Sequence, residues 1–146
     1  MDRGKVFISG PIQGMEHRQG YREKLRKILL SYGYEPIDPW EREKVLYKYP
    51  DKDWWIKIPP KSFIERDLND IERCDFLVAY LPRLSAGTCM EIFYAKLKGK
   101  ITVVISRLKN PSPWITFHTD VMIRSFRDLK KILELGIEKA VKERSR

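Results

Sequence analysis

Five short apolar runs recur along the 146-residue chain, and turn residues or charged residues separate them. Runs of about four to eight apolar residues with such boundaries are typical of buried strands. The pattern therefore predicts strands at residues 5–8, 34–37, 75–81, 101–106 and 121–125.

Between these runs, apolar residues recur three and four positions apart, which is typical of amphipathic helices. The spacing predicts helices over residues 21–32, from Ser62 toward the third strand, over 88–98 and over 126–143. Ser62 with Glu65, and Thr88 with Glu91, each have the spacing of a capping box. Residues 40–60 have no regular period, and we expect a partly helical insertion or lid there.

Strands that alternate with helices indicate right-handed βαβ units and a parallel sheet. We therefore predict an α/β fold, a three-layer α/β/α, Rossmann-like, doubly wound parallel sheet of about five strands, as one domain over residues 1–146. If the strand order is the flavodoxin-like 2-1-3-4-5, ligands bind where the order reverses, between the first and third strands. The loops at that point are residues 9–14 and 84–88.

The composition, with 42% hydrophobic and 34% charged residues, is that of a globular protein. The apolar runs are shorter than the roughly 18 residues of a membrane span, and the first residues contain no apolar signal-peptide segment. We therefore expect a cytoplasmic protein without a membrane segment. Cys74 and Cys89 lie in apolar surroundings without Cys-x-x-Cys spacing, so we expect small buried side chains and neither a disulfide framework nor a metal site.

The formal net charge of +9 is compatible with a phosphorylated or polyanionic ligand. Acidic and basic runs alternate along the chain, however, which is typical of solvated helix faces with ion pairs. Nucleic acid is therefore not the expected partner. A basic nucleic-acid-binding domain stays open as an alternative, and it would bind with a steep salt dependence.

Both loops at the predicted crevice contain glycine, which allows the backbone to approach a ligand closely. The second loop runs into the N-terminus of a helix, where unpaired N–H groups and the helix dipole favour an anion. These features indicate a phosphate site. Neither loop has a Gly-x-Gly-x-x-Gly or a Walker A sequence, so ordinary post-strand turns are the alternative.

Asp67 and Glu91 are the candidate catalytic carboxylates. Asp67 lies beside the apolar stripe Ile64, Leu68 and Ile71, and Glu91 lies among apolar residues in the first turn of its helix. In a half-buried crevice, desolvation and like-charge proximity give two carboxylates different pKa values and different roles. Helix capping and interaction with a helix dipole are the alternative roles.

Four segments, in order along the chain, resemble the nucleoside 2-deoxyribosyltransferase superfamily. They are residues 5–12 (KVFISGPI), 34–39 (YEPIDP), 66–79 (RDLNDIERCDFLVA) and 85–95 (SAGTCMEIFYA). The Gly-Thr-x-x-Glu pattern that ends at Glu91, with Asp67 24 residues before it, is the more specific part. The superfamily includes transferases that exchange bases between deoxynucleosides, and N-hydrolases that cut nucleoside 5'-monophosphates.

The resemblance implies that Glu91 is the nucleophile, which attacks the anomeric carbon and forms a glycosyl ester, as carboxylates do in retaining glycosidases. It implies that Asp67 positions the sugar and the nucleophile and assists protonation of the leaving base. It implies no cofactor. The substrate-binding residues that we predict are Phe7, Ser9, Gly10, Ile12, Gln13, Ser85, Gly87, Thr116 and His118.

The chain departs from the superfamily pattern at three places. Ser85 stands where transferases acting on nucleosides carry an acid, and a hydroxyl there suits a 5'-phosphate that a carboxylate would repel. Phe7 replaces a tyrosine of many members, which leaves ribose and deoxyribose open. The asparagine that transferases supply from a neighbouring subunit is missing, and Thr116 or His118 is expected at its position, with an ordinary surface or interface role as the alternative for His118.

These residues predict an N-glycosidase that releases free base and sugar 5-phosphate from nucleoside 5'-monophosphates. A deoxyribosyltransferase acting on nucleosides and a non-catalytic nucleotide-binding module on the same fold are the alternatives. Because the sites of the superfamily are usually completed across a dimer interface, we expect a homodimer or a higher homo-oligomer. Trp54 and Trp55 are candidates for a lid or a base-stacking surface, with core-edge packing or a dimer contact as the alternative.

Overall fold

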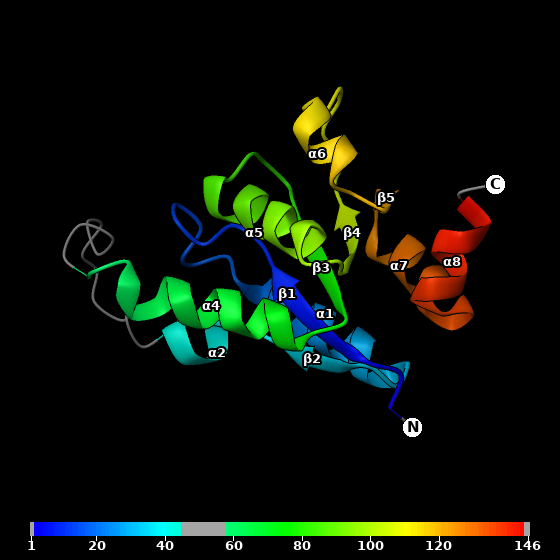
Figure 1. Ribbon diagram of the computed structural model, residues 1–146, viewed down its shortest axis with the longest axis horizontal. Helices are drawn as coiled ribbons and strands as arrows, with labels where there is room; N and C mark the ends of the chain where they lie inside the picture. Colours follow the sequence, from blue (N-terminus) through cyan, green and yellow to red (C-terminus); the bar gives the residue numbers. More distant parts are fainter. Residues whose placement is uncertain (1, 45–57, 145–146) are drawn as a thin grey trace.

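The centre of the molecule is a five-stranded parallel sheet. The computed structural model describes residues 2–44 and 58–144. The strands are β1 (Lys5–Ser9), β2 (Glu35–Ile37), β3 (Phe76–Tyr80), β4 (Ile101–Ile105) and β5 (Val121–Ile123). They pair in the order β2-β1-β3-β4-β5, all in parallel (Figure 1). This confirms the predicted α/β fold class and the flavodoxin-like strand order.

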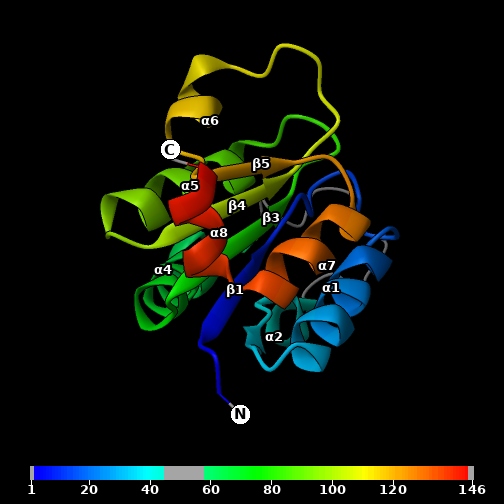
Figure 2. The same cartoon turned by 90° about the vertical axis from the view of Figure 1, so that its right-hand side faces the viewer.

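Helices cover both faces of the sheet, as Figure 2 shows. One face carries α1 (Gly20–Ser31), α7 (Phe126–Leu135) and α8 (Ile137–Arg144), and the other carries α4 (Lys61–Arg73) and α5 (Ala86–Leu97). Two short helices lie outside these layers: α2 (Trp40–Glu43) follows β2, and α6 (Pro113–Phe117) follows β4. The layers confirm the predicted three-layer architecture.

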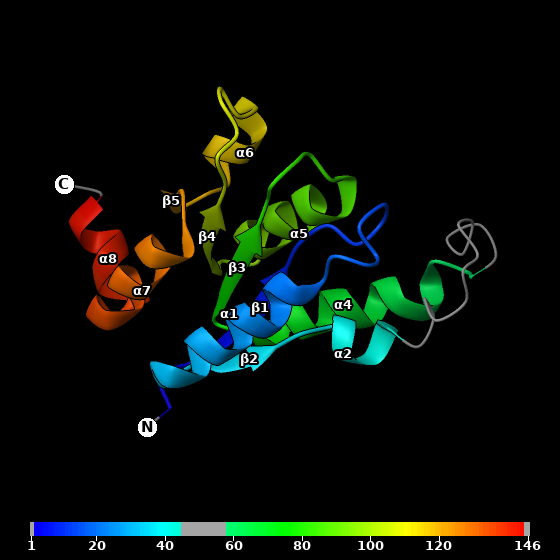
Figure 3. The ribbon, with the colours of Figure 1, turned by 180° about the vertical axis from the view of Figure 1, so that it is seen from behind.

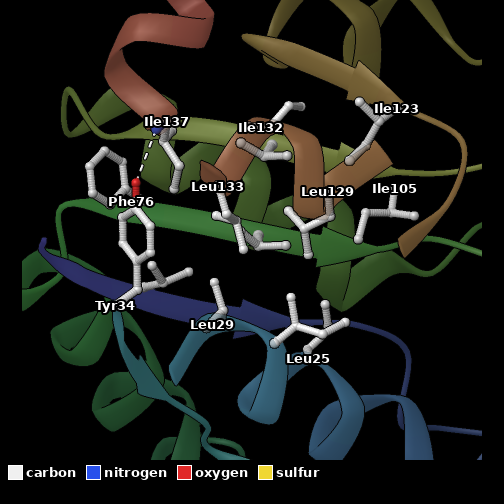
Figure 4. Close-up of a cluster of buried hydrophobic side chains, with 14 of the residues drawn as sticks. Leu25, Leu29, Tyr34, Phe76, Ile105, Ile123, Leu129, Ile132, Leu133 and Ile137 are labelled. Atoms are coloured by element: carbon white, nitrogen blue, oxygen red, sulfur yellow. Dashed lines mark hydrogen bonds between the residues drawn. The ribbon is translucent and has the colours of Figure 1, made fainter. Parts of the chain in front are cut away.

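Alternate residues of the strands fill two apolar cores, one on each face of the sheet, because successive side chains of a strand point to opposite faces. In β1, Val6 and Ile8 pack toward α1 and α7, and Phe7 packs toward α4 and α5. Figure 4 shows the first core, where the backbone N–H of Ile137 also donates to the hydroxyl of Tyr34 at 3.0 Å.

The predicted single helix over residues 126–143 is wrong, because the chain breaks it into α7 and α8 at Gly136. This glycine has φ +105°, a conformation that L side chains rarely adopt. The sequence analysis also missed α6, which begins with a Ser112 side-chain cap and a proline in its first turn.

Both predicted capping boxes are wrong. Helix α4 begins after Pro60, and the Ser62 hydroxyl donates to the carbonyl of Pro59 at 2.6 Å. Helix α5 begins two residues earlier than expected, with Ser85 as its N-cap, so Thr88 lies inside the helix. Ile64, which was expected on the buried stripe of α4, is 43% exposed.

Several other expectations concern residues at the edges of the fold. Of the predicted insertion over 40–60, α2 is helical, whereas residues 45–57, with Trp54 and Trp55, lie outside the described residues. Cys74 is buried, Cys89 is half-buried, and both are free thiols. No helix in the described ranges is long and apolar enough to cross a membrane.

Candidate active site

A cavity of about 650 Å³ lies at the carboxyl ends of β1 and β3, where the strand order reverses. The loops that follow these two strands form its walls and lie side by side (Figure 3). The Arg83 guanidinium joins them by donating to the carbonyl of Gln13 at 2.7 Å. The cavity thus lies at the place where the strand order predicts a ligand crevice.

Asp67 and Glu91 line this cavity together. Asp67 comes from α4 and Glu91 from α5, and both helices pack on the same face of the sheet through apolar residues such as Ile71 and Ile92. The two carboxylates predicted from helical spacing are therefore brought to one place by packing of their helices.

The carboxyl of Glu91 is held by Ser9, the last residue of β1. The Ser9 hydroxyl is fully buried and donates to Oε1 of Glu91 at 2.6 Å. Burial raises the pKa of Glu91 to about 8, and the negative charge of Asp67 acts in the same direction, while the hydrogen bond from Ser9 partly opposes the shift. Ser9 therefore orients Glu91 and favours its ionised form.

Glu43, which the sequence analysis did not single out, is a third carboxyl lining the cavity. It ends the short helix α2 and is only 3% exposed, and Asp67 beside it is 7% exposed. Burial raises the pKa of both carboxyls, and the hydrogen bond between them raises that of Glu43 further, to about 10. Burial and the contact with Asp67 therefore favour the protonated form of Glu43.

A buried arginine supports the loop after β1. Arg22 on α1 is 2% exposed, and its guanidinium donates to the carbonyls of Ile8 and Gly10 at 3.3 and 2.8 Å and to Asp38 at 2.9 Å. The sequence pattern placed the basic residues of this helix in solvent. The signal in the sequence was Asp38, because a carboxylate that is buried at the end of a strand requires a charged partner, and the Asp38 side chain is 2% exposed.

Ser85 and Gly87 form the cavity wall at the N-terminus of α5. The Ser85 hydroxyl accepts hydrogen bonds from the N–H and from the hydroxyl of Thr88, at 3.4 and 3.2 Å, so its own hydrogen is available for another acceptor. A Cβ added at Gly87 would meet nothing within 4 Å. This wall has the hydroxyl, the helix dipole and the open space that an anion requires.

Of the other predicted substrate-binding residues, some line the cavity and some lie outside it. Gly10, Ile12 and Gln13 line the cavity, as expected. Phe7 is fully buried in the apolar core beneath α4 and α5, and Ser9 contacts Glu91 from behind the cavity wall.

Thr116 and His118 lie on and just after α6, outside this cavity. The Thr116 hydroxyl donates to the carbonyl of Ser112 at 3.1 Å, and the His118 ring stacks with Trp114. His118 lines a second, apolar cavity of about 540 Å³ between α5 and α6. Neither residue reaches the carboxylates of its own chain.

The fold and the site define an α/β protein with paired carboxylates at the topological switch point of its sheet. Residues 6–136 match the model of the nucleoside 2-deoxyribosyltransferase family, and the chain belongs to this family. Its members are nucleoside N-glycosidases or deoxyribosyltransferases, so the chain is an enzyme of this group.

A relative from Thermofilum pendens, which carries the name 2'-deoxynucleoside 5'-phosphate N-hydrolase 1, is 29% identical over 114 residues, 76% of each chain. Two solved structures share the fold. A 2-deoxyribosyltransferase from Bacillus psychrosaccharolyticus has a TM-score of 0.68 at 17% identity, over 86% of this chain and 90% of that one. A CMP N-glycosidase from Clostridium botulinum has a TM-score of 0.59 at 20% identity, over 90% of this chain and 98% of that one.

Proposed function

We propose that this enzyme cleaves the N-glycosidic bond of nucleoside 5'-monophosphates and that Glu91 is its nucleophile. The observation that carries the proposal is the arrangement of one cavity, in which the carboxylates of Asp67 and Glu91 lie together and Ser85 stands at the N-terminus of α5. The name of the relative from Thermofilum pendens, a hydrolase of 2'-deoxynucleoside 5'-phosphates, supports the same substrate class.

The charges of the cavity wall support a phosphorylated substrate. Ser85 offers a hydroxyl, α5 offers its N-terminal N–H groups, and Arg83 adds a cation. An acid in place of Ser85 would repel a phosphate. The 5'-phosphate is therefore expected at this wall, with the anomeric carbon of the sugar directed toward Glu91.

The reaction follows from these positions. The ionised carboxylate of Glu91, oriented by Ser9, attacks the anomeric carbon. The bond between this carbon and the base nitrogen breaks, and its electron pair leaves with the base. Asp67 donates a proton to the departing base. Water then attacks the anomeric carbon of the ester and gives one proton back to Asp67, while the bond to Glu91 breaks and the sugar 5-phosphate is released.

A panel of nucleosides and their 5'-monophosphates tests this proposal, with released base measured by chromatography. Cleavage of monophosphates well above the matching nucleosides is the expected result. Equal or faster cleavage of nucleosides would contradict the assignment of the phosphate wall. The panel also identifies the base and the sugar that the enzyme prefers.

Hydrolysis is the expected fate of the ester, because the chain lacks the acid at position 85 and the asparagine that accompany base transfer in the superfamily. A transferase must exclude water and hold an acceptor base. One nucleotide supplied with a different free base tests this expectation. Free sugar phosphate supports hydrolysis, whereas predominant base exchange would identify a transferase with the same nucleophile.

We also propose that two copies of the chain associate through the apolar face of α5 and α6. Large side chains are exposed there, with Trp114 at 73% and Phe117 at 77%. Ser85 and Ala86 line both the apolar cavity on this face and the active-site cavity, so a second copy would lie beside the substrate and bring its own Thr116 or His118 near it. A cytoplasmic location likewise stays a prediction.

The mass in solution tests this association. Light scattering is expected to give a dimer or a multiple of one, and Trp114→Glu is expected to give a monomer. A wild-type monomer at the concentrations of the activity assay would contradict the proposal.

A further inference from the structure

Glu43 is a buried acid that lines the cavity, and the reaction proposed for Glu91 and Asp67 does not use it. It lines the same cavity as both of them and is almost fully buried. Within the described part of the chain, buried Oε1 of Glu43 and Oδ1 of Asp67 find no hydrogen-bond donor other than each other's carboxyl. An unpaired buried oxygen is costly, so a carboxyl placed in this way normally serves a ligand or a proton.

The charges around Glu43 do not balance if every acid is ionised. The carboxyls that line or adjoin the cavity are those of Asp38, Glu43, Asp67, Asp70 and Glu91. Of the residues in the described ranges, two carry guanidinium groups that lie among these carboxyls. Arg22 is paired with Asp38, and Arg42 bonds to Asp70 and lies 3.6 Å from Asp67.

Arg83, the other cation on the wall, lies at the exposed rim and is bonded to the opposite loop. Within the described residues, two guanidiniums are too few to neutralise five buried or half-buried carboxylates, which favours protonation of part of this cluster. The acids that face Glu43 are Asp67 and Glu91, and the cations are Arg22 and Arg42.

We propose that Glu43 carries a proton that it shares with Asp67, and that this proton is the one delivered to the departing base. The inference rests on the proposed N-glycosidase function. Glu43 acts through Asp67 and is a positioning residue, because its proton passes to Asp67 as Asp67 donates to the base.

The proton is conserved over the two half-reactions. When the bond to the base nitrogen breaks, that nitrogen receives the electron pair and one proton, and the Glu43–Asp67 pair is left with none. When water attacks the glycosyl ester, the oxygen–carbon bond to Glu91 breaks, and the pair takes the proton that water loses. The carboxyl pair therefore ends the cycle as it began, and water is the one co-reactant.

The first test is the pH dependence of kcat in Glu43→Gln, with Glu41→Gln as the matched control. Glu41 lies on the same short helix but is exposed and paired with Arg26 and Lys44. The amide of Glu43→Gln can stabilise ionised Asp67 but brings no proton to it. We expect the maximal rate to fall by about tenfold or more and the alkaline limb of the profile to move to lower pH, with no change in Glu41→Gln.

Leaving-group dependence separates proton delivery from a general disturbance of the cavity. A 2-deoxyribose 5-phosphate with a nitrophenol leaving group departs as a stable anion and needs no proton. Glu43→Gln is expected to cleave it within about twofold of the wild-type rate. Equal losses for this substrate and for a nucleotide, or an alkaline limb that stays in place, would overturn the proposal.

A carboxyl ¹³C NMR titration of the intact protein decides whether the proton is shared, whatever the enzyme cleaves. Glu43→Gln and Asp67→Asn assign the two resonances. One protonated carboxyl in the pair near pH 7 is the expected result, and two ionised carboxyls would overturn the inference. If the NMR titration shows one shared proton but the enzyme cleaves no nucleotide, the proposed function is wrong, and so is the catalytic use of this proton.

Discussion

Replacement of Ser9 by alanine tests whether this hydroxyl tunes the nucleophile. The hydrogen bond from Ser9 to Glu91 is short, at 2.6 Å, and is buried. A hydrogen bond to a charged group contributes about 1.5–3 kcal/mol, and each 1.36 kcal/mol corresponds to roughly one pH unit in a pKa. The pKa of Glu91, already raised to about 8 by burial, should therefore rise further by roughly 1 to 2 in Ser9→Ala.

The sign of the effect follows from the form of Glu91 that reacts. In the proposed mechanism the nucleophile is the ionised carboxylate, so a higher pKa lowers its population at neutral pH. We expect kcat/KM near pH 7 to fall roughly 10- to 100-fold, with the acid limb of the pH profile moved to higher pH. A loss of the same size at every pH would refute the reasoning, as would an unmoved acid limb.

Ser106→Ala is the matched control for this experiment. Ser106 is a buried serine that directly follows β4, and its hydroxyl donates to the carbonyl of Leu81 at 2.7 Å. Its loss removes a comparable buried hydrogen bond without touching Glu91. The control should lose stability but keep the acid limb of the wild-type protein.

Two further predictions concern the loops. Ser85→Asp keeps an N-cap for α5, because aspartate caps helices as well as serine does. It should lower the preference for monophosphates over nucleosides by on the order of 100-fold in kcat/KM, and an unchanged preference would place the phosphate elsewhere. Gly10→Ala would put a Cβ 2.3 Å from the hydroxyl oxygen of Tyr21, which donates a hydrogen bond to the carbonyl of Pro11. We expect chemical unfolding to show a destabilisation of about 1–3 kcal/mol, and an unchanged stability would show that the Tyr21 side chain moves aside.

The sheet and the two carboxylates of the cavity could be predicted because their signals are local. Buried parallel strands read as short apolar runs, and β1, β3 and β4 coincide closely with three such runs. Asp67 and Glu91 could be identified from the sequence for a similar reason, since each lies beside apolar residues at helical spacing. The strand order then placed both carboxylates at the carboxyl edge of the sheet.

Glu43 and Arg22 could not be predicted because their burial depends on tertiary packing. Glu43 lies in an irregular stretch rich in charged residues, where a single carboxyl has no distinguishing context. Arg22 looks like the other basic residues of its helix until the loop after β1 folds over it and offers its carbonyls. The spacing of Thr88 and Glu91 indicated a cap at Thr88, whereas the loop after β3 places Ser85 in extended conformation at the start of α5, where its side chain accepts from the N–H of Thr88.

Base release by Glu91→Gln tests the central claim most directly. The amide has the shape of the carboxyl but cannot form the ester, so release of base from a nucleotide should fall below detection. The variant should melt no earlier than the wild-type protein. Because burial raises the pKa of Glu91 to about 8, the wild-type protein loses stability as the pH rises toward and through that value, and the amide removes this loss. A folded Glu91→Gln variant that still releases base within about tenfold of the wild-type rate would show that Glu91 is not the nucleophile.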